Sequence, residues 1–218
     1  MIPLILKLKK AKHKELVKAQ DIIVEEIYRF FENAVIHGGT AIWRCYQGNR
    51  FSEDIDVYIA RDEKRINALF ESLRDKGFGI KKKKIGEKSL YSVMSYNRET
   101  VMLEALFKKA KGSLKEYETA EGNFITVYTL KPEELIIEKA EAYLKRNKIR
   151  DIYDVFFLLR YVNNREAIIK QLGRLIRNFK KPIDETDLKV LIIQGIVPSW
   201  EKMLEYIKNY IRWEKKNT

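Results

Sequence analysis

The stretch VIHGGTAIWRCYQGNRFSEDIDVYIA, residues Val35–Ala60, places two adjacent glycines after a short apolar run and an Asp-Ile-Asp triplet inside a second one. In a strand, side chains two residues apart point the same way, so Asp54 and Asp56 share one face while Ile55 and Val57 point to the opposite, buried face. Two carboxylates held this close repel each other unless a cation lies between them. Oxygen ligands at this spacing suit Mg²⁺, which binds one or two carboxylates together with substrate phosphates and water.

The glycine pair supplies the other half of a nucleotide site. Gly38 and Gly39 lack a Cβ, which lets a triphosphate approach the backbone N–H groups at the start of the following helix. Thr40 can cap that helix, which we expect to run to about Gln47. An Asp-x-Asp on a strand usually reflects only the alternation of solvent-facing and buried residues, and a Gly-Gly is usually only a turn. The two motifs at this spacing together favour a site for metal and nucleotide.

The whole chain sets the frame for this site. Its 218 residues, 45% of them hydrophobic, can bury a sizeable core in one ordinary domain or two small ones, and we favour two. The net charge of +12 comes from 43 Lys and Arg against 31 Asp and Glu, a balance that attracts phosphate-rich partners. A solvated surface with ion-pair networks, as in heat-stable proteins, is the alternative interpretation.

Cysteine content and hydropathy bear on the compartment. Cys45 is the only cysteine, so no intramolecular disulfide is possible, and it is expected to be a packing residue in a reducing interior. The apolar run at the N-terminus is too short for a signal peptide, and no segment approaches the roughly 18 apolar residues of a membrane span. We therefore expect a soluble, cytoplasmic protein without a membrane partner.

Periodicity predicts a mixed first half of the chain. A helix is expected from Lys12 to Asn33, a short buried strand before Gly38, and a helix that Asp62 caps and Gly77 ends. Four further strands are expected at residues 78–85, 89–96, 100–107 and 124–129, with turns at Gly86 and Asn97 and a loop around Gly112.

The pattern changes at Lys131-Pro132. Pro132 fits the first position of a helix, and helical periodicity continues to Trp213 with breaks near Asn163, Pro182 and Pro198. This predicts an α+β fold with a mixed first domain, residues 1–130, and a second domain of four or five helices, residues 131–218.

The opening stretch resembles the signature of the nucleotidyltransferase superfamily and, more narrowly, that of its AbiEii/AbiGii abortive-infection toxin branch. The matching residues are Gly38-Gly39-Thr40-Ala41-Ile42, Gly48, Arg50, Ser52, Asp54 and Asp56. A second match, LKPEELIIEKAEAYLKRNKIRDIYDVFFLL at residues 130–159, is similar to the helical motif of that branch. Onto it we place Lys139, Arg150, Asp151 and Asp154.

The resemblance implies a nucleotidyltransferase-fold mixed sheet with helices, followed by an all-helical domain that completes the active-site cleft. It implies a third carboxylate on a neighbouring strand, and Glu104 in VMLEALF is the candidate, because an acidic residue in an apolar strand is costly to bury without a cation or hydrogen bonds. The alternative is that Glu104 points to solvent or pairs with a lysine.

The implied reaction moves a nucleoside monophosphate from an NTP to a hydroxyl. Two Mg²⁺ ions would be held by Asp54, Asp56 and Glu104, with Glu104 or Asp56 taking the acceptor's proton. The residues assigned to the triphosphate are the Gly38-Gly39 backbone, Thr40, Arg50, Ser52 and Lys139.

Several of these residues have simpler interpretations. Asp151 is expected to orient Lys139 or to lie near the acceptor, or merely to cap its helix. Lys139 could be one solvated lysine among many, and Arg50 could pair with Asp54 or Glu53. His37 is expected to be a packed imidazole rather than a catalytic base.

Lysines 81–84 form a run that alternates faces on a strand, so the run predicts a sheet edge or a projecting hairpin. Edge protection and contact with an RNA backbone are equally compatible with it. A second cluster comprises lysines 7, 9, 10, 12 and 14, and Tyr91 and Tyr96 lie near the first cluster, where they could stack on a base or simply pack.

The leading hypothesis is a Mg²⁺-dependent nucleotidyltransferase with an RNA acceptor, the 3′ end of tRNA, acting as the toxin partner of a cognate antitoxin. A protein hydroxyl as acceptor keeps the chemistry and changes the partner. A non-catalytic member of the fold that binds nucleotide or RNA is the third possibility, although all three predicted carboxylates are present.

Overall fold

The computed structural model describes residues 2–214, which form two compact units. Unit 1 comprises the chain up to Gln47 and Phe51–Leu130, and unit 2 comprises Gly48–Arg50 and the chain from Lys131 onward. The division at residue 131 is the one at which the sequence pattern changes. The short segment Gly48–Arg50 is an addition to unit 2, and it joins that unit through a bridge between Arg50 and Ile192.

Unit 1 is built on one seven-stranded mixed sheet in the order β3-β4-β5-β2-β1-β7-β6. The β2/β5 and β1/β7 pairs are parallel and the other pairs are antiparallel, which confirms the predicted α+β class. The strands are β1 (Val35–His37), β2 (Asp54–Ile59), β3 (Gly79–Ile85), β4 (Ser89–Tyr96), β5 (Glu99–Phe107), β6 (Ser113–Glu118) and β7 (Phe124–Thr129).

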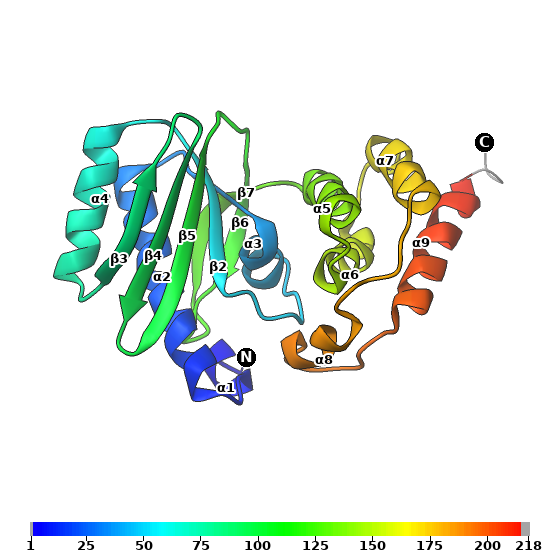
Figure 1. Ribbon diagram of the computed structural model, residues 1–218, viewed down its shortest axis with the longest axis horizontal. Coiled ribbons are helices and arrows are strands. Elements are labelled where there is room, and N and C mark those ends of the chain that lie inside the picture. The colour runs from blue at the N-terminus through cyan, green and yellow to red at the C-terminus, as the bar shows by residue number, and fades with distance from the viewer. Residues whose placement is uncertain (1, 215–218) are drawn as a thin grey trace. The chain divides into compact units, whose positions relative to one another are not determined.

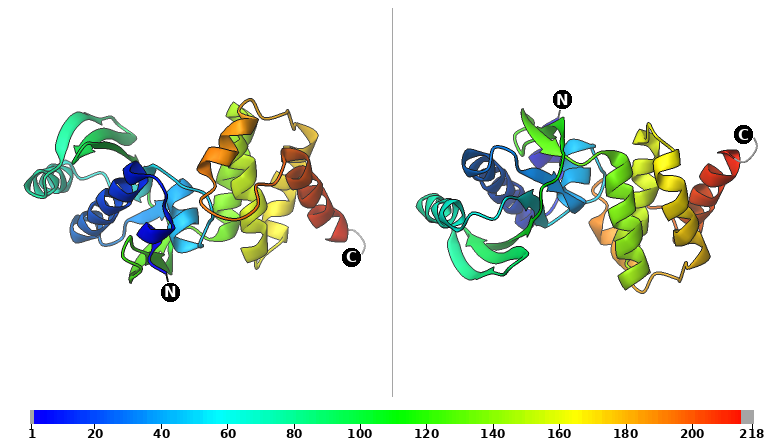
Figure 2. Two further views of the ribbon diagram at one scale, coloured as in Figure 1. Left: turned by 90° about the horizontal axis from the view of Figure 1, so that it is seen from below. Right: turned by 90° about the horizontal axis from the view of Figure 1, so that it is seen from above.

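Two helices, α2 (Ala11–Phe30) and α4 (Glu63–Asp75), lie side by side on one face of this sheet (Figures 1 and 2). Ile55, Val57 and Leu103 point to that face and are almost fully buried. The opposite face, which we term the open face, carries Asp54 and Asp56. Two shorter helices complete the unit: α1 (Leu4–Lys7) and α3 (Gly38–Cys45), which packs against β2 and β6.

Most predicted boundaries in unit 1 are confirmed. The carboxylate of Asp62 accepts a hydrogen bond from the Arg65 N–H and caps α4. Gly77 follows α4 with a φ of +91°, and Asn97 turns the chain between β4 and β5 with a φ of +53°. These are positions where glycine and asparagine adopt the left-handed conformation with least strain.

Three local expectations were wrong. The first long helix ends at Phe30 rather than near Asn33, and α3 begins at Gly38, so Thr40 lies inside the helix and does not cap it. The segment after Gly112 is a strand, β6, rather than a loop. Its Lys-Glu content hides the strand pattern, because charged residues are depleted in strands. At this sheet edge Lys115 and Glu116 remain in solvent, whereas Tyr117 is buried and Glu118 is buried and paired with Lys7.

Unit 2 is helical throughout its described part. Its α-helices are α5 (Pro132–Arg146), α6 (Ile149–Leu158), α7 (Glu166–Arg177), α8 (Leu188–Leu191) and α9 (Trp200–Glu214), joined with the 3-10 turns η1 (Leu159–Tyr161) and η2 (Glu185–Asp187). Pro132 occupies the first turn of α5, as predicted, and Asn147 ends it with a φ of +49°. Within residues 2–214, no helix is both long and apolar enough to cross a membrane.

Candidate active site

Asp54 and Asp56 lie on the open face of β2, near the middle of the sheet. Both side chains are partly exposed, whereas Ile55 and Val57 between and after them are buried against the helices. The alternation predicted from the sequence is therefore present. It holds two carboxylates on one side of a strand whose other side is fixed by the core.

Glu104 stands beside Asp56 on the adjacent strand. In the parallel β2/β5 ladder, Glu104 is directly opposite Asp56, so the two side chains share the open face about 4.8 Å apart along the sheet. Glu104 is exposed to solvent, which corrects the argument that it would be a buried acid in an apolar strand. The three predicted carboxylates nevertheless lie on the same face of neighbouring strands.

Gly38 closes one side of this carboxylate group. Its φ is +70°, and a Cβ built on it would lie 2.0 Å from Oδ2 of Asp56. Both the backbone conformation and the space exclude a side chain at this position. The Gly38-Gly39 pair thus brings the start of α3 directly against the Asp56 carboxylate, with the first N–H groups of the helix at the site.

Thr40 and Ser52 lie next to the first residues of β2. The Thr40 hydroxyl donates a hydrogen bond to the backbone carbonyl of Asp54, and its side chain is fully buried. Thr40 therefore fixes α3 to the start of β2. Ser52 is buried as well, and its carbonyl accepts a hydrogen bond of 2.8 Å from the Gln20 side chain.

Gln20 is a positioning residue that the sequence argument missed. Its side-chain amide on α2 donates to the carbonyls of Ser52 and Glu53, at 2.8 and 3.1 Å, and so holds the segment that leads into β2. The signal in the sequence is its spacing, because Gln20 lies four residues after Leu16 and three before Ile23, on the apolar side of the expected helix, where a polar side chain needs hydrogen-bond partners.

His37 is a packed imidazole, as expected. Its ring stacks on Tyr58 with the centroids 3.9 Å apart, and it lies opposite Asp56 in the β1/β2 ladder.

Unit 2 contains a separate buried cluster of the motif residues. Arg50 donates two hydrogen bonds of 2.8 Å to the two carboxylate oxygens of Asp154 on α6. Lys139 on α5 lies 3.2 Å from Asp154 and 3.9 Å from Asp151. Arg50 therefore pairs with Asp154 inside unit 2.

The charges of this cluster balance. Burial alone would raise the pKa of Asp154, but Arg50 and Lys139 outweigh it and hold that pKa below its usual value. Burial opposes the charged form of Arg50 too, and Asp154 more than compensates, so the pKa of Arg50 is raised. Arg50 and Asp154 thus favour each other's charged form inside unit 2.

Asp151 is fully buried and does not cap its helix. Its carboxylate accepts two hydrogen bonds from Arg146, at 2.7 and 2.8 Å. The N–H of Ile149, at the start of α6, donates instead to Asp184 at 2.7 Å. Arg150, the remaining residue of the motif, is half-buried.

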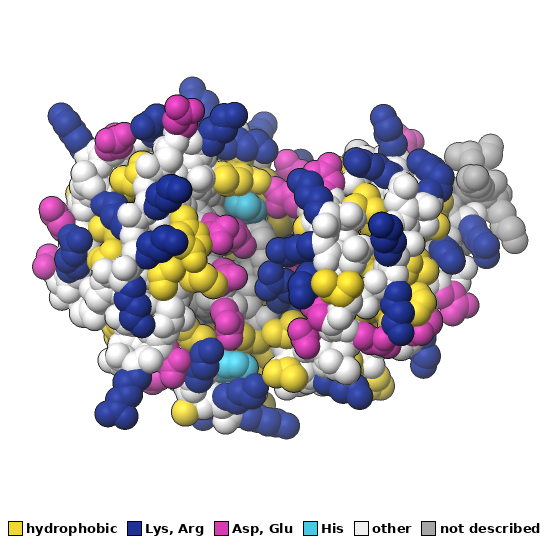
Figure 3. Space-filling view, viewed as in Figure 1, with side chains coloured by type: hydrophobic (Ala, Val, Ile, Leu, Met, Phe, Trp, Pro, Cys, Tyr) yellow, Lys and Arg dark blue, Asp and Glu magenta, His cyan; other side chains and the backbone are white. Residues whose placement is uncertain are grey.

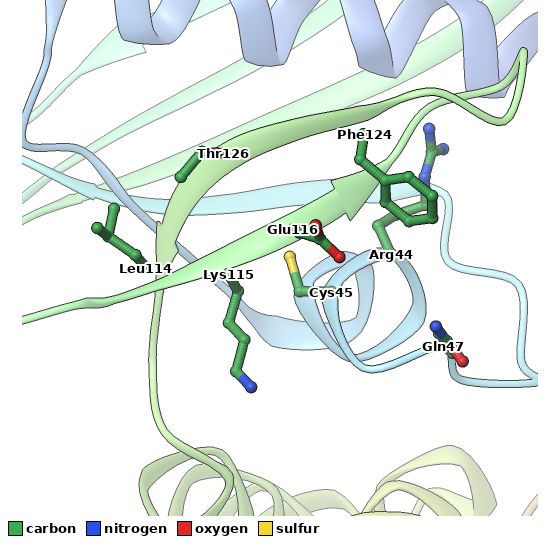
Figure 4. Close-up of a pocket in the computed structure, with 8 residues that line it drawn as sticks. All are labelled: Arg44, Cys45, Gln47, Leu114, Lys115, Glu116, Phe124 and Thr126. Atoms are coloured by element: carbon green, nitrogen blue, oxygen red, sulfur yellow. The ribbon is translucent and has the colours of Figure 1, made fainter.

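Unit 1 also has a cavity of about 370 Å³ on the β6 side of the sheet, lined by Arg44, Cys45, Gln47, Leu114, Lys115, Glu116, Phe124 and Thr126 (Figure 4). None of the predicted site residues lines it. Burial raises the pKa of Cys45 to about 12, so this thiol is not a nucleophile at neutral pH.

Comparison with known proteins decides the family. The model of the nucleotidyltransferase AbiEii toxin family of type IV toxin–antitoxin systems matches residues 23–208, most of the chain. The chain belongs to this family. It is accordingly a nucleotidyltransferase, and the motifs at residues 38–56 and 130–159 both lie inside the match.

Relatives of the chain include a protein of Aquifex aeolicus (strain VF5), aq_aa25, which is 24% identical over a match that covers 94% of this chain and 97% of that protein. Among solved structures, MenT4, a nucleotidyltransferase toxin from Mycobacterium tuberculosis H37Rv, has a TM-score of 0.62 at 19% identity, covering 94% of this chain and 89% of that one.

A putative nucleotidyltransferase from H. pylori has a TM-score of 0.65 at 18% identity, covering 96% and 99% of the two chains. At these identities the likeness establishes the fold, and it confirms the predicted one.

The donor set of the AbiEii site fits a divalent cation. Asp54 and Asp56 supply hard oxygen ligands of the kind that Mg²⁺ prefers, and the glycine at position 38 lets the backbone at the start of α3 lie against the Asp56 carboxylate. Within residues 2–214, no three acidic, histidine or cysteine side chains already converge in a metal-binding geometry. The ligand set Asp54, Asp56 and Glu104 therefore stays a prediction.

Proposed function

We propose that this enzyme transfers a nucleoside monophosphate from an NTP to the 3′-terminal hydroxyl of a tRNA, with Mg²⁺ as cofactor. A new bond forms between that hydroxyl oxygen and the α-phosphorus, the bond between the α- and β-phosphates breaks, and pyrophosphate leaves. The observation that carries the proposal is the group of three carboxylates on the open face, Asp54, Asp56 and Glu104, with the Gly38-Gly39 backbone against Asp56. A basic chain of net charge +12 supports RNA as the acceptor.

Each residue of unit 1 then has a definite task. Asp54 and Asp56 would hold the cation, with Glu104 as the third ligand or as the base that takes the acceptor's proton. Bound Mg²⁺ would stabilise negative charge on the attacking and leaving oxygens. The N–H groups at the start of α3 would bind phosphate, since a helix N-terminus favours anions.

The helical motif assigns Lys139 to the triphosphate and Asp151 to its orientation, and the predicted role of residues 131–218 is to complete the site. Inside unit 2, Lys139 is held by Asp154 and Asp151, which supports a fixed rather than a solvated ammonium. The family implies an antitoxin partner as well.

The test incubates the purified protein with total tRNA, Mg²⁺ and each of the four NTPs labelled at the α-phosphate. Label in the tRNA band from one NTP, lost with EDTA and in Asp54→Asn and Asp56→Asn, is the expected result. Asp75→Asn, an exposed aspartate at the end of α4, is the matched control and should retain full activity.

Circular dichroism of both variants should match the parent protein, since the side chains are on the open face. Full activity in either variant would contradict the assignment of the carboxylates. Label on protein alone would replace RNA with a protein hydroxyl as acceptor, and binding without any label would indicate a non-catalytic member of the fold.

A further inference from the structure

The strand register aligns one row of side chains across the open face. The ladders pair Asp56 with Glu104, Glu104 with Tyr91, and Tyr91 with Lys84, across β2, β5, β4 and β3. Directly opposed residues of a sheet point to the same face. The predicted catalytic carboxylates, an aromatic ring and a lysine therefore follow one another over three strand spacings, roughly 14 Å.

The lysine run of β3 is divided between the two faces. Lys82 lies opposite Val93, in the row of Asp54 and Met102, so Lys82 and Lys84 both belong to the open face. Lys83 points the other way, where its ammonium lies 2.6 Å from the side chain of Asn67 on α4.

The open-face lysines are not neutralised by neighbouring acids. Among the described residues, neither Lys82 nor Lys84 forms an ion pair, and both are exposed. In the N-terminal cluster, by contrast, Lys7 pairs with Glu118 at 3.0 Å and Lys12 with Glu53 at 3.6 Å. Lys82 and Lys84 are thus available to the phosphates of a polyanion.

Tyr91 fills the position between the lysines and the carboxylates. Its hydroxyl lies 3.4 Å from the sulfur of Met102, and the Lys82 ammonium lies 5.2 Å from its ring centroid. The ring is partly exposed, and the lysine above it is a flexible, exposed side chain that can move to a phosphate. In Figure 3, basic side chains gather over β3 and β4, acidic ones over β2 and β5, and apolar ones between them.

Edge protection explains lysines on an outer strand, but it requires no aromatic ring between them and the carboxylates. Single-stranded nucleic acid needs both features, because its phosphates bind cations and its bases stack on aromatic faces. We propose that the acceptor RNA runs across the open face from the carboxylates to the β3 edge, with a base on Tyr91 and phosphates at Lys82 and Lys84. This inference rests on the proposed function, since it concerns the acceptor of the same site.

The experiment measures binding of total tRNA by filter retention, without NTP, at several salt concentrations. Lys82→Ala/Lys84→Ala should weaken binding and reduce the slope of log K against log salt by about 1 to 2, one unit or slightly less for each lost phosphate contact. The matched control is Lys64→Ala/Arg74→Ala, which removes two exposed charges from α4 on the other face.

Tyr91 separates RNA from other polyanions. Tyr91→Leu should weaken binding about fivefold or more, and Tyr91→Phe should restore it, because stacking needs the ring and not the hydroxyl. An acidic protein segment as the true partner of this surface would leave tRNA binding unchanged in Tyr91→Leu, and that result overturns the proposal.

Equal losses in the β3 and α4 double variants would also overturn it, since only net charge would then matter. If Lys82→Ala/Lys84→Ala transfers label to tRNA as well as the parent protein does, the RNA path is refuted and the proposed function stands. Absence of tRNA binding by the parent protein would refute both the RNA path and tRNA as the acceptor. Label on protein would then still support the proposed metal and NTP site.

Discussion

Gly38 is the residue on which the site geometry depends most directly. Two independent features require glycine at this position. The backbone φ is positive, and a Cβ would lie 2.0 Å from the Asp56 carboxylate. Thr40 and Gln20 act at the same level, because each binds a carbonyl of the segment at Ser52–Asp54 and so fixes the start of β2.

Gly38→Ala should reduce nucleotide transfer about 100-fold, because the methyl group must displace the Asp56 carboxylate from its position. It should also cost about 1 to 2 kcal/mol of stability for the left-handed backbone. Steady-state transfer assays and urea denaturation measure the two effects. The control is Gly77→Ala, which has a φ of +91° and open space around it, so it should lose stability and keep activity.

In unit 2, Asp154 is the residue on which the buried cluster depends most directly. Asp154→Asn leaves Arg50 and Lys139 as buried charges without their carboxylate, and it should cost about 3 to 5 kcal/mol of unfolding free energy. Glu185→Gln, which removes the exposed pair with Lys181, should change it by less than about 1 kcal/mol. A loss no larger than that of the exposed pair would contradict the buried network.

The same variant tests the pH dependence. The folded pKa of Asp154 lies below its unfolded value, so its contribution is fully present above the unfolded pKa of about 3.9 and is lost as pH falls through the folded pKa. Urea midpoints between pH 6 and pH 3 should therefore fall more steeply in the parent protein than in Asp154→Asn.

At the level of elements, one buried arginine ties α3 to α2 and to β6. Arg44 on α3 binds the carboxylate of Asp21 on α2 and donates a hydrogen bond of 2.6 Å to the carbonyl of Glu118 on β6. Its guanidinium also lies 4.5 Å from the ring centroid of Tyr117. The helix that begins with Gly38-Gly39 is thereby held at its far end.

Arg44→Met should destabilise the protein by about 3 to 5 kcal/mol, because it removes the cation that pairs with the partly buried Asp21 carboxylate. Arg44→Met/Asp21→Asn should be more stable than Arg44→Met alone, since the amide still accepts the N–H of Ala120 without a buried charge. Denaturation of the four proteins in this cycle gives the coupling, and a double variant that is the less stable of the two would contradict an ion pair.

For the whole molecule, the chain combines a mixed-sheet unit that carries the carboxylates with a helical unit that carries the second motif. The family match spans both, from residue 23 to residue 208, so the two units belong to one enzyme. Charge is used in two ways: Lys82 and Lys84 are exposed on the open face, whereas Arg50, Lys139, Asp151 and Asp154 are buried together in unit 2. Exposed charges can meet a polyanion, whereas the buried ones satisfy each other.

The sequence alone was sufficient for the fold class, the change at residue 131, the strand that presents Asp54 and Asp56, and the family. These features depend on local periodicity and on motif spacing, which can be read from residues close together in the sequence. Cap and turn residues such as Asp62, Gly77 and Asn97 were predictable for the same reason, because each acts on its own neighbours.

Other features depend on contacts between segments distant in sequence, and no local pattern reports them. The pairing of Arg50 with Asp154 joins residues 104 positions apart, and the exposure of Glu104 beside Asp56 follows from the register of β5 on β2. The strand β6 forms because β7 pairs with it, against its own charged composition. Register and burial are properties of the packed sheet, and they bring Tyr91 and Lys84 into line with the carboxylates.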